Sequence, residues 1–167
     1  MSARLGGRLI GIAVRSGHRA PMQTLERASI ALGAGVEGDY KGAKHPRRGV
    51  TLLAREAWEA ALAALGTDTD DAGLPWTARR ANLLVEGVSL PRAVGGVVRV
   101  GPAVLEVTYP TTPCRRMDEV RAGLLRALYP DGRSGITCRV VEGGAIAIGD
   151  CVEVLVSPPE RKIRLPG

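Results

Sequence analysis

The sequence contains no phenylalanine, and its tyrosines and tryptophans bring the aromatic content to only 3%. Proteins that bind single-stranded nucleic acids stack the bases on aromatic side chains. Arginine carries almost all of the positive charge behind the net charge of +6, and it suits bidentate recognition of phosphate or carboxylate groups. The basic residues form no dense stripe. We therefore expect either a small anionic ligand or simply solvated arginines, rather than nucleic acid.

Cysteine and histidine are also scarce. The three cysteines, Cys114, Cys138 and Cys151, form no CxxC pair, and their odd number argues against a disulfide framework. The two histidines, His18 and His45, stand apart from any HExxH-type motif. We therefore expect reduced thiols and no protein-built zinc site, so that any metal arrives on a cofactor.

Long apolar runs and nucleotide-binding motifs are missing as well. The longest apolar runs, at residues 60–65 and 94–98, are far shorter than the roughly 20 residues that cross a bilayer. Residues 1–7 are not followed by the apolar stretch of a signal peptide. No GxxxxGKS/T or GxGxxG element follows a predicted strand, which argues against ATP and dinucleotide enzymes. These absences predict a cytoplasmic protein with no membrane partner.

Short β-prone runs, separated by glycine and proline turns, dominate the 167 residues. Strands are predicted at residues 8–14, 25–32, 50–53, 82–85, 97–100, 104–108, 136–141, 145–148 and 151–156. Helices are predicted at residues 55–65 and 118–128. This pattern predicts a mainly β (α+β) fold, a barrel or a sandwich, in one domain over residues 1–156. Residues 157–167 contain three prolines, which predicts an extended or disordered tail.

Four segments together resemble the MOSC domain, the family named for the C-terminal domain of molybdenum cofactor sulfurase. They are GVEGD at 35–39, RGVTL at 48–52 with the helix that follows, RANLLVEG at 80–87, and PCRRM at 113–117 with VEGGAIAIGD at 141–150. Their order and spacing match the family over residues 8–156, so the signal is specific. The resemblance implies a stand-alone, bacterial-type member with a β-barrel and a few peripheral helices.

The resemblance also implies that one cysteine, here Cys114, carries sulfur or ligates the molybdenum of a pterin cofactor. The chemistry around it agrees, because Arg115, Arg116 and a helix beginning after Met117 would stabilise a thiolate. A buried structural cysteine beside solvated arginines is the alternative. The family's cofactor-binding branch resembles CxRC here, and Met117 takes the place of the second cysteine. This favours a single persulfide or a single metal–sulfur bond over a local disulfide relay. Cys138 and Cys151 are expected to be small buried hydrophobes.

An anion site is predicted ahead of the strand at 82–85. Arg79, Arg80 and Asn82 resemble the family's arginine and asparagine motif, which in cofactor-binding members contacts the pterin or its phosphate. Two guanidiniums and an amide can offer several charge-assisted hydrogen bonds to an anion. The alternative is that the two arginines only flank the strand and that Asn82 caps it. Further candidates are Arg47 and Arg48, Thr108 with Thr111 and Thr112, and Glu37 with Asp39, whose glycine-rich loop also fits a simple turn. Lys41, Lys44 and His45 are interpreted as solvated loop charges.

These observations lead to two main functional hypotheses, and a third, nucleic-acid association driven by charge, ranks below both. The first is a MOSC protein that binds molybdenum cofactor or a related pterin or sulfur ligand, with activity as a sulfur transferase or a molybdenum-cofactor-dependent enzyme. The resemblance associates the family with pyridoxal phosphate, but the sequence contains no such domain. We therefore expect a sulfur donor such as a cysteine desulfurase, and a molybdoenzyme as acceptor. The alternative is a non-catalytic, arginine-based binding module for an anionic metabolite, in which Cys114 is incidental.

Overall fold

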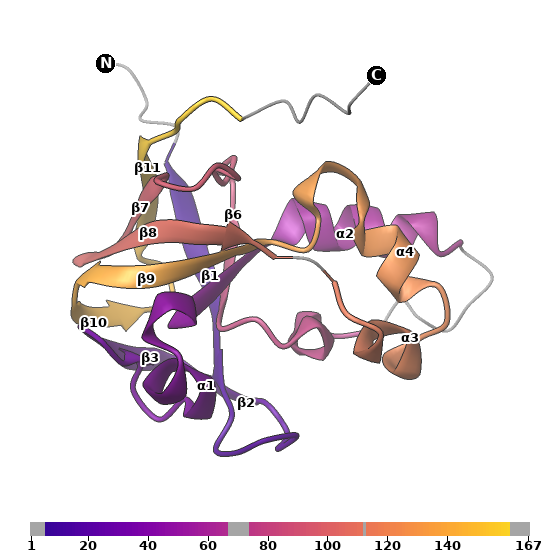
Figure 1. Cartoon of the computed structure of the whole chain (residues 1–167), viewed down its shortest axis with the longest axis horizontal. Coiled ribbons are helices and arrows are strands. Elements are labelled where there is room, and N and C mark those ends of the chain that lie inside the picture. The colour runs from indigo at the N-terminus through magenta and orange to yellow at the C-terminus, as the bar shows by residue number, and fades with distance from the viewer. Residues whose placement is uncertain (1–5, 67–73, 112, 161–167) are drawn as a thin grey trace, which may run out of the picture.

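A seven-stranded β-barrel forms the centre of the computed structural model, which describes residues 6–66, 74–111 and 113–160 (Figure 1). The strand order is β11-β7-β8-β9-β5-β6-β1, and pairing of β1 with β11 closes the barrel. The barrel strands are β1 (Gly7–Val14), β5 (Val50–Ala54), β6 (Leu83–Glu86), β7 (Val97–Val100), β8 (Ala103–Pro110), β9 (Ile136–Glu142) and β11 (Cys151–Val156). This closed sheet with few short helices confirms the predicted mainly β fold.

Smaller β elements extend the barrel. Strand β2 (Gln23–Leu25) pairs with the far end of β1. A three-stranded sheet is formed by β10 (Gly144–Ala147), β3 (Arg27–Ala31) and β4 (Gly35–Val36). The prediction of one continuous strand at 25–32 is therefore wrong, because these residues belong to two separate strands, β2 and β3. The chain leaves the barrel sheet at Glu26, whose carbonyl accepts a hydrogen bond from Ile148 N–H at 2.9 Å, and joins the second sheet.

Aliphatic side chains fill the barrel. Fully buried examples come from five different strands, namely Leu9, Ile12, Leu52, Leu83, Leu105 and Ile136. Strand β5 is almost wholly buried because helices cover its outer face. This explains why its sequence, VTLL, does not alternate between apolar and polar residues.

In the described part of the chain, four short α-helices lie outside the barrel: α1 (Tyr40–Lys44), α2 (Arg55–Ala64), α3 (Arg116–Val120) and α4 (Leu124–Leu128). Figure 1 shows α2, α3 and α4 together on one side of the barrel, with α1 near β3. Helix α2 was predicted, and its Trp58 and Ala61 are buried in a second core with Met117, Leu124 and Leu128. None of the described helices is long and apolar enough to span a membrane.

The helix predicted at 118–128 is in fact two helices. Helix α3 ends at Val120, and α4 starts after Gly123, whose φ of +90° is a left-handed conformation that glycine adopts without strain. The break lets Met117 and Leu124 both face the second core. Residues 157–160 of the predicted tail carry no helix or strand, and residues 161–167 lie outside the described residues.

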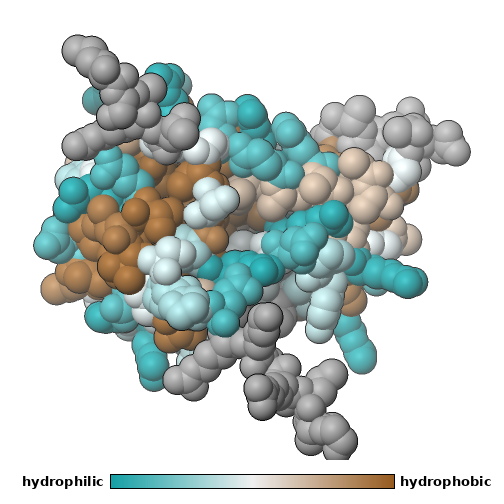
Figure 2. Space-filling model, turned by 90° about the horizontal axis from the view of Figure 1, so that it is seen from above, coloured by the Kyte–Doolittle hydropathy of each residue, from teal (hydrophilic) through white to brown (hydrophobic). Residues whose placement is uncertain are grey.

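One face of the molecule carries a hydrophobic area over the barrel (Figure 2). Figure 2 shows hydrophobic residues gathered on the barrel side of one face, with hydrophilic residues over much of the rest. Exposed apolar side chains of the described chain include Val94, Leu155 and Val156, near β7 and in β11. This surface contrasts with the cationic pocket that holds Cys114.

Candidate functional site

Cys114 is exposed and lines a cavity of about 520 Å³ between the barrel and the helices. It lies on the segment that leads from β8 to α3, which crosses from one half of the molecule to the other (Figure 1). The other lining residues are the cations Lys41, Arg48 and Arg79, the hydroxyl residues Thr51, Thr111 and Thr137, and Tyr109. The volume is in the range that accommodates a cofactor-sized ligand.

Arg79 is the most firmly held cation of this pocket. It lies in the 3₁₀ helix η3 (Trp76–Arg79), just before β6. Its Nη2 donates to Ser134 Oγ and Thr111 Oγ1, both at 2.8 Å, and its Nε donates to the Ser134 carbonyl at 3.1 Å. Burial lowers the pKa of Arg79, while the neighbouring Cys114 acts in the opposite direction. The guanidinium is therefore oriented and close enough to Cys114 to interact with it electrostatically.

Lys41 and Arg48 add two further positive charges. Lys41 comes from α1 and Arg48 from the 3₁₀ helix η1 (Pro46–Arg48), and the Arg48 guanidinium lies 5.5 Å from the centre of the Tyr109 ring. Burial lowers the pKa of Lys41, and the nearby Arg15, Arg79 and Arg48 lower it further. Its interpretation as a solvated loop charge is wrong, because α1 folds it against the pocket.

Replacing Lys41 with methionine is expected to stabilise the protein at pH 7 by about 1 kcal/mol, because it removes a desolvated charge among like charges. A lowered pKa in the folded state means that the ammonium opposes folding at neutral pH. This penalty fades as the pH rises from the lowered pKa through the unfolded-state value of about 10.4. Urea unfolding at pH 7 and at pH 10 checks both points. Lys44→Met, at an exposed lysine of the same helix, is the control; equal effects of the two variants would contradict the explanation.

Three predicted site residues support the pocket from behind instead of lining it. Asn82 is buried, its Oδ1 accepts from Thr51 N–H at 3.0 Å, and its Nδ2 donates to the Ala13 carbonyl at 3.2 Å. Asp39 caps α1 and accepts from Gly42 N–H at 3.3 Å and from Arg15 N–H at 3.1 Å. Thr108 Oγ1 lies 2.5 Å from the Arg47 carbonyl and 3.1 Å from that of Thr137. These hydrogen bonds fix the positions of β1, β5, β8, β9, α1 and η1 relative to one another around the cavity.

The other predicted arginines lie near the pocket but outside its lining. Arg80 has a left-handed φ of 64°, and its Nη2 donates to the Ala20 carbonyl at 2.5 Å. Burial lowers the pKa of Arg80, and the charges of Arg15 and Arg116 lower it further. Arg47 and Arg115 are exposed, and Arg115 is the N-cap of α3. Helix α3 begins at Arg116 rather than after Met117, and the Cys114 carbonyl accepts from Met117 N–H at 3.0 Å.

The two remaining cysteines differ from each other. Cys138 is buried in β9, as predicted, and burial raises its pKa far above the usual range, so its thiol is inert. Cys151 is exposed, which corrects the prediction that it is buried. It begins β11, where its side chain faces outward and its Sγ lies 4.0 Å from Glu153 Oε1. Cys114 is thus distinguished from Cys151 by its cationic pocket and not by exposure.

Sequence reasoning missed the lining residues Thr51, Tyr109 and Thr137, in addition to Lys41. It also missed Ser134, which orients Arg79. Thr51 and Thr137 read as ordinary strand residues, and they face each other across the β5–β9 pair. No local signal marks them, because the register of two strands distant in sequence brings them together. Thr112, a further candidate, lies outside the described residues.

The pocket residues fit a molybdenum–pterin group. Cys114 offers one soft sulfur ligand, and the three cations and several hydroxyls offer donors for phosphate or other anionic groups. Within residues 6–66, 74–111 and 113–160, no three histidine, cysteine or acidic side chains are grouped to hold a metal ion. A metal in this pocket would therefore take most of its ligands from its own cofactor.

A family model described as "MOSC domain" matches residues 39–153. A search of curated proteins gave no match. The YuaD protein from Bacillus subtilis is a structural neighbour with a TM-score of 0.75 and 19% identity, covering 89% of this chain and 95% of that one. YiiM from Escherichia coli gives a TM-score of 0.68 and 17% identity, covering 92% of this chain and 72% of that one. YiiM from Geobacillus stearothermophilus gives a TM-score of 0.67 and 16% identity, covering 90% of this chain and 75% of that one. At these identities the structural likeness shows a shared fold.

Proposed function

Because the chain belongs to the MOSC domain family, we propose that it binds molybdenum cofactor, or a related pterin or sulfur ligand, in the Cys114 pocket. In this proposal Cys114 carries sulfur as a persulfide or ligates molybdenum. The observation that carries the proposal is an exposed thiol that shares a cavity with three cations, one of them fixed by four hydrogen bonds. A structural cysteine needs none of these features.

Sulfur transfer to Cys114 needs only a persulfide donor. The Cys114 thiolate would attack the terminal sulfur of the donor persulfide, so that a new sulfur–sulfur bond forms at Cys114, the donor's sulfur–sulfur bond breaks and the donor leaves as a thiolate. The reaction is balanced without an oxidant. Arg79 would favour the thiolate and the anionic persulfide through its fixed positive charge. A cysteine desulfurase is the proposed donor, a molybdoenzyme is the proposed acceptor, and the cytoplasm, which keeps thiols reduced, is the proposed location.

If the ligand is the molybdenum cofactor, the cofactor supplies the redox chemistry of the metal. The chain's own residues would bind and orient it. Lys41 and Arg48 stand where they can hold anionic groups, and Thr51, Thr111 and Thr137 offer hydroxyls along the wall. Cys114 would supply the one protein sulfur ligand.

Wild-type protein, incubated anaerobically with a cysteine desulfurase and cysteine, is expected to gain the mass of one sulfur atom. Peptide mapping by mass spectrometry should place that sulfur on Cys114. A parallel incubation with molybdenum cofactor, followed by gel filtration and metal analysis, should show retained molybdenum if Cys114 is a metal ligand. Folded protein that takes up neither sulfur nor molybdenum would contradict the proposal.

The same cations favour a second candidate function, a binding module for an anionic metabolite in which Cys114 takes no part. Three positive charges around one cavity can bind an anion without any thiol. The two functions differ in whether ligand affinity depends on Cys114. The serine variant at this position separates them.

A further inference from the structure

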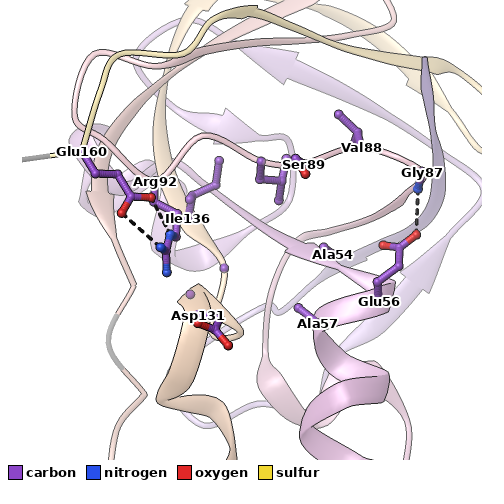
Figure 3. A pocket seen from close by; sticks show the side chains of 13 residues that line it. Ala54, Glu56, Ala57, Gly87, Val88, Ser89, Arg92, Asp131, Ile136 and Glu160 are labelled. Carbon is purple, nitrogen blue, oxygen red and sulfur yellow. Dashed lines mark hydrogen bonds and ion pairs between the residues drawn. The ribbon is translucent and has the colours of Figure 1, made fainter. Parts of the chain in front are cut away.

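A second cavity of the described chain lies apart from the Cys114 pocket. It has a volume of about 630 Å³, and its lining shares no residue with that pocket. Figure 3 shows that the start of α2, the loop after β6, the segment before β9 and residue Glu160 surround it. This volume falls in the range of small-molecule sites. The proposed function does not use this cavity.

One end of the cavity is built like a carboxylate site that is already filled. Arg92 Nε lies 2.8 Å from Glu160 Oε1, and Arg92 Nη2 lies 3.0 Å from Oε2. This two-pronged geometry is the one that an arginine uses for a ligand carboxylate. The Arg92 side chain also rests on Gly132, where a Cβ would overlap Arg92 Cδ. The guanidinium is therefore oriented by the fold, and Glu160 occupies the place that a ligand could take.

The contact with Glu160 is easily exchanged. The side chains of Arg92 and Glu160 are 39% and 56% exposed. Exposed ion pairs contribute little net stability, because water and salt compete with them. Glu160 also lies on residues 157–160, which carry no helix or strand. A free carboxylate could thus replace Glu160 without disturbing the barrel.

The other residues that line the cavity determine which chemical groups its ligand must have. Glu56 and Asp131 also line the cavity, so with Glu160 displaced its formal charge is −1, from one arginine and two carboxylates. One oxygen of Glu56 accepts from Gly87 N–H at 2.8 Å (Figure 3), and among the described residues the other oxygen has no hydrogen-bond donor. A plain anion would be repelled by these carboxylates, whereas a molecule that adds an ammonium group would be attracted. Aliphatic side chains cover the remaining wall, at Ala54, Ala57, Val88, Leu90 and Ile136.

We propose that this cavity is a second binding site, for an amino acid with an aliphatic side chain, and that Glu160 closes it by imitating the ligand's carboxylate. The ligand carboxylate replaces Glu160 on Arg92, its ammonium faces Asp131, whose neighbour Gly132 contacts Arg92 (Figure 3), and its side chain packs on the aliphatic wall. This site is independent of Cys114 and of the molybdenum or sulfur chemistry proposed for it.

Isothermal titration of the full chain with L-leucine tests the proposal. Two matched probes accompany it: 4-methylpentanoate, which lacks the amino group, and 3-methylbutylamine, which lacks the carboxylate. We expect leucine to bind more tightly than either probe. Glu160→Gln should tighten leucine binding by up to about fivefold, because it removes the competing carboxylate. Arg92→Gln should weaken it by about tenfold or more.

Arg139→Gln is the matched control, since Arg139 forms a similar exposed ion pair with Glu106 outside this cavity. It should leave leucine affinity unchanged, and thermal unfolding should show that all variants are folded. Arg92→Lys keeps the charge without the fork, and it should bind leucine with intermediate affinity. No leucine binding to either wild-type or Glu160→Gln protein would overturn the site. Equal affinity for 4-methylpentanoate would overturn the role of the ammonium group.

Discussion

The Cys114→Ser variant is expected to take up no sulfur from a persulfide donor and to retain no molybdenum through this residue. A serine hydroxyl is not ionised at neutral pH and is a hard oxygen ligand, so it replaces neither the nucleophile nor the soft metal ligand. Because Cys114 is exposed and serine is nearly the same size, the free energy of unfolding should change by less than about 0.5 kcal/mol. Intact-protein mass spectrometry and metal analysis after loading measure the effect.

Cys151→Ser is the matched control for this experiment. Cys151 is the second exposed thiol, but it lies on β11 and lines no part of the cationic pocket. It should load as the wild type does. Sulfur on the Cys114→Ser protein, or its loss from Cys151→Ser, would show that Cys114 is not the residue that selectively carries sulfur. If Cys114→Ser keeps its ligand affinity and any cellular phenotype, the anion-binding module is the better description.

The Asn82→Ala variant is expected to lose about 2–5 kcal/mol of unfolding free energy. Its side-chain amide bonds the two strands on either side of it, since Oδ1 accepts from Thr51 N–H in β5 and Nδ2 donates to the Ala13 carbonyl in β1. The backbone of Asn82 also bonds Thr51 and Ala13, and the alanine variant keeps those two hydrogen bonds. Asn82 is only 5% exposed, so truncation leaves two backbone groups buried without partners. Each such group costs about 1–3 kcal/mol. Urea unfolding monitored by circular dichroism measures the loss.

Gln23→Ala provides the comparison, because Gln23 is an exposed amide on the short strand β2. Its removal should change the unfolding free energy by less than about 0.5 kcal/mol. A loss below about 1 kcal/mol for Asn82→Ala would mean that water replaces the amide and that Asn82 is not a structural bridge. The barrel would then be held at this point by its ladder bonds alone.

The strands were predictable where local signals were strong. The strand from Gly7 to Val14 is rich in β-branched residues, and a Gly-Pro pair marks the turn before β8. Gly66, with a φ of +93°, marks the end of helix α2. The break between α3 and α4 was missed because Gly123 is tolerated inside a helical pattern at moderate cost. Packing of Met117 and Leu124 into one core decides that the helix breaks there.

The residues of the candidate site were also predictable only in part. Cys114, Arg48 and Arg79 could be proposed from motifs, and the fold places all three in the lining of one cavity. Asn82 and Asp39 were proposed from the same motifs, but their hydrogen bonds go to backbone groups. A motif records which residues are required together. It does not record whether a polar side chain meets a ligand or a neighbouring strand.

The sequence by itself determined the family, the β-rich composition of the fold and the cysteine that the family's motif singles out, because these depend on residue identity and spacing along the chain. Only the tertiary structure decided that Cys151 faces outward, that Lys41 joins Arg48 and Arg79 at the thiol, and that Glu160 lies on Arg92. Barrel closure and strand register bring residues together across long stretches of chain, and local spacing carries no information about those distances.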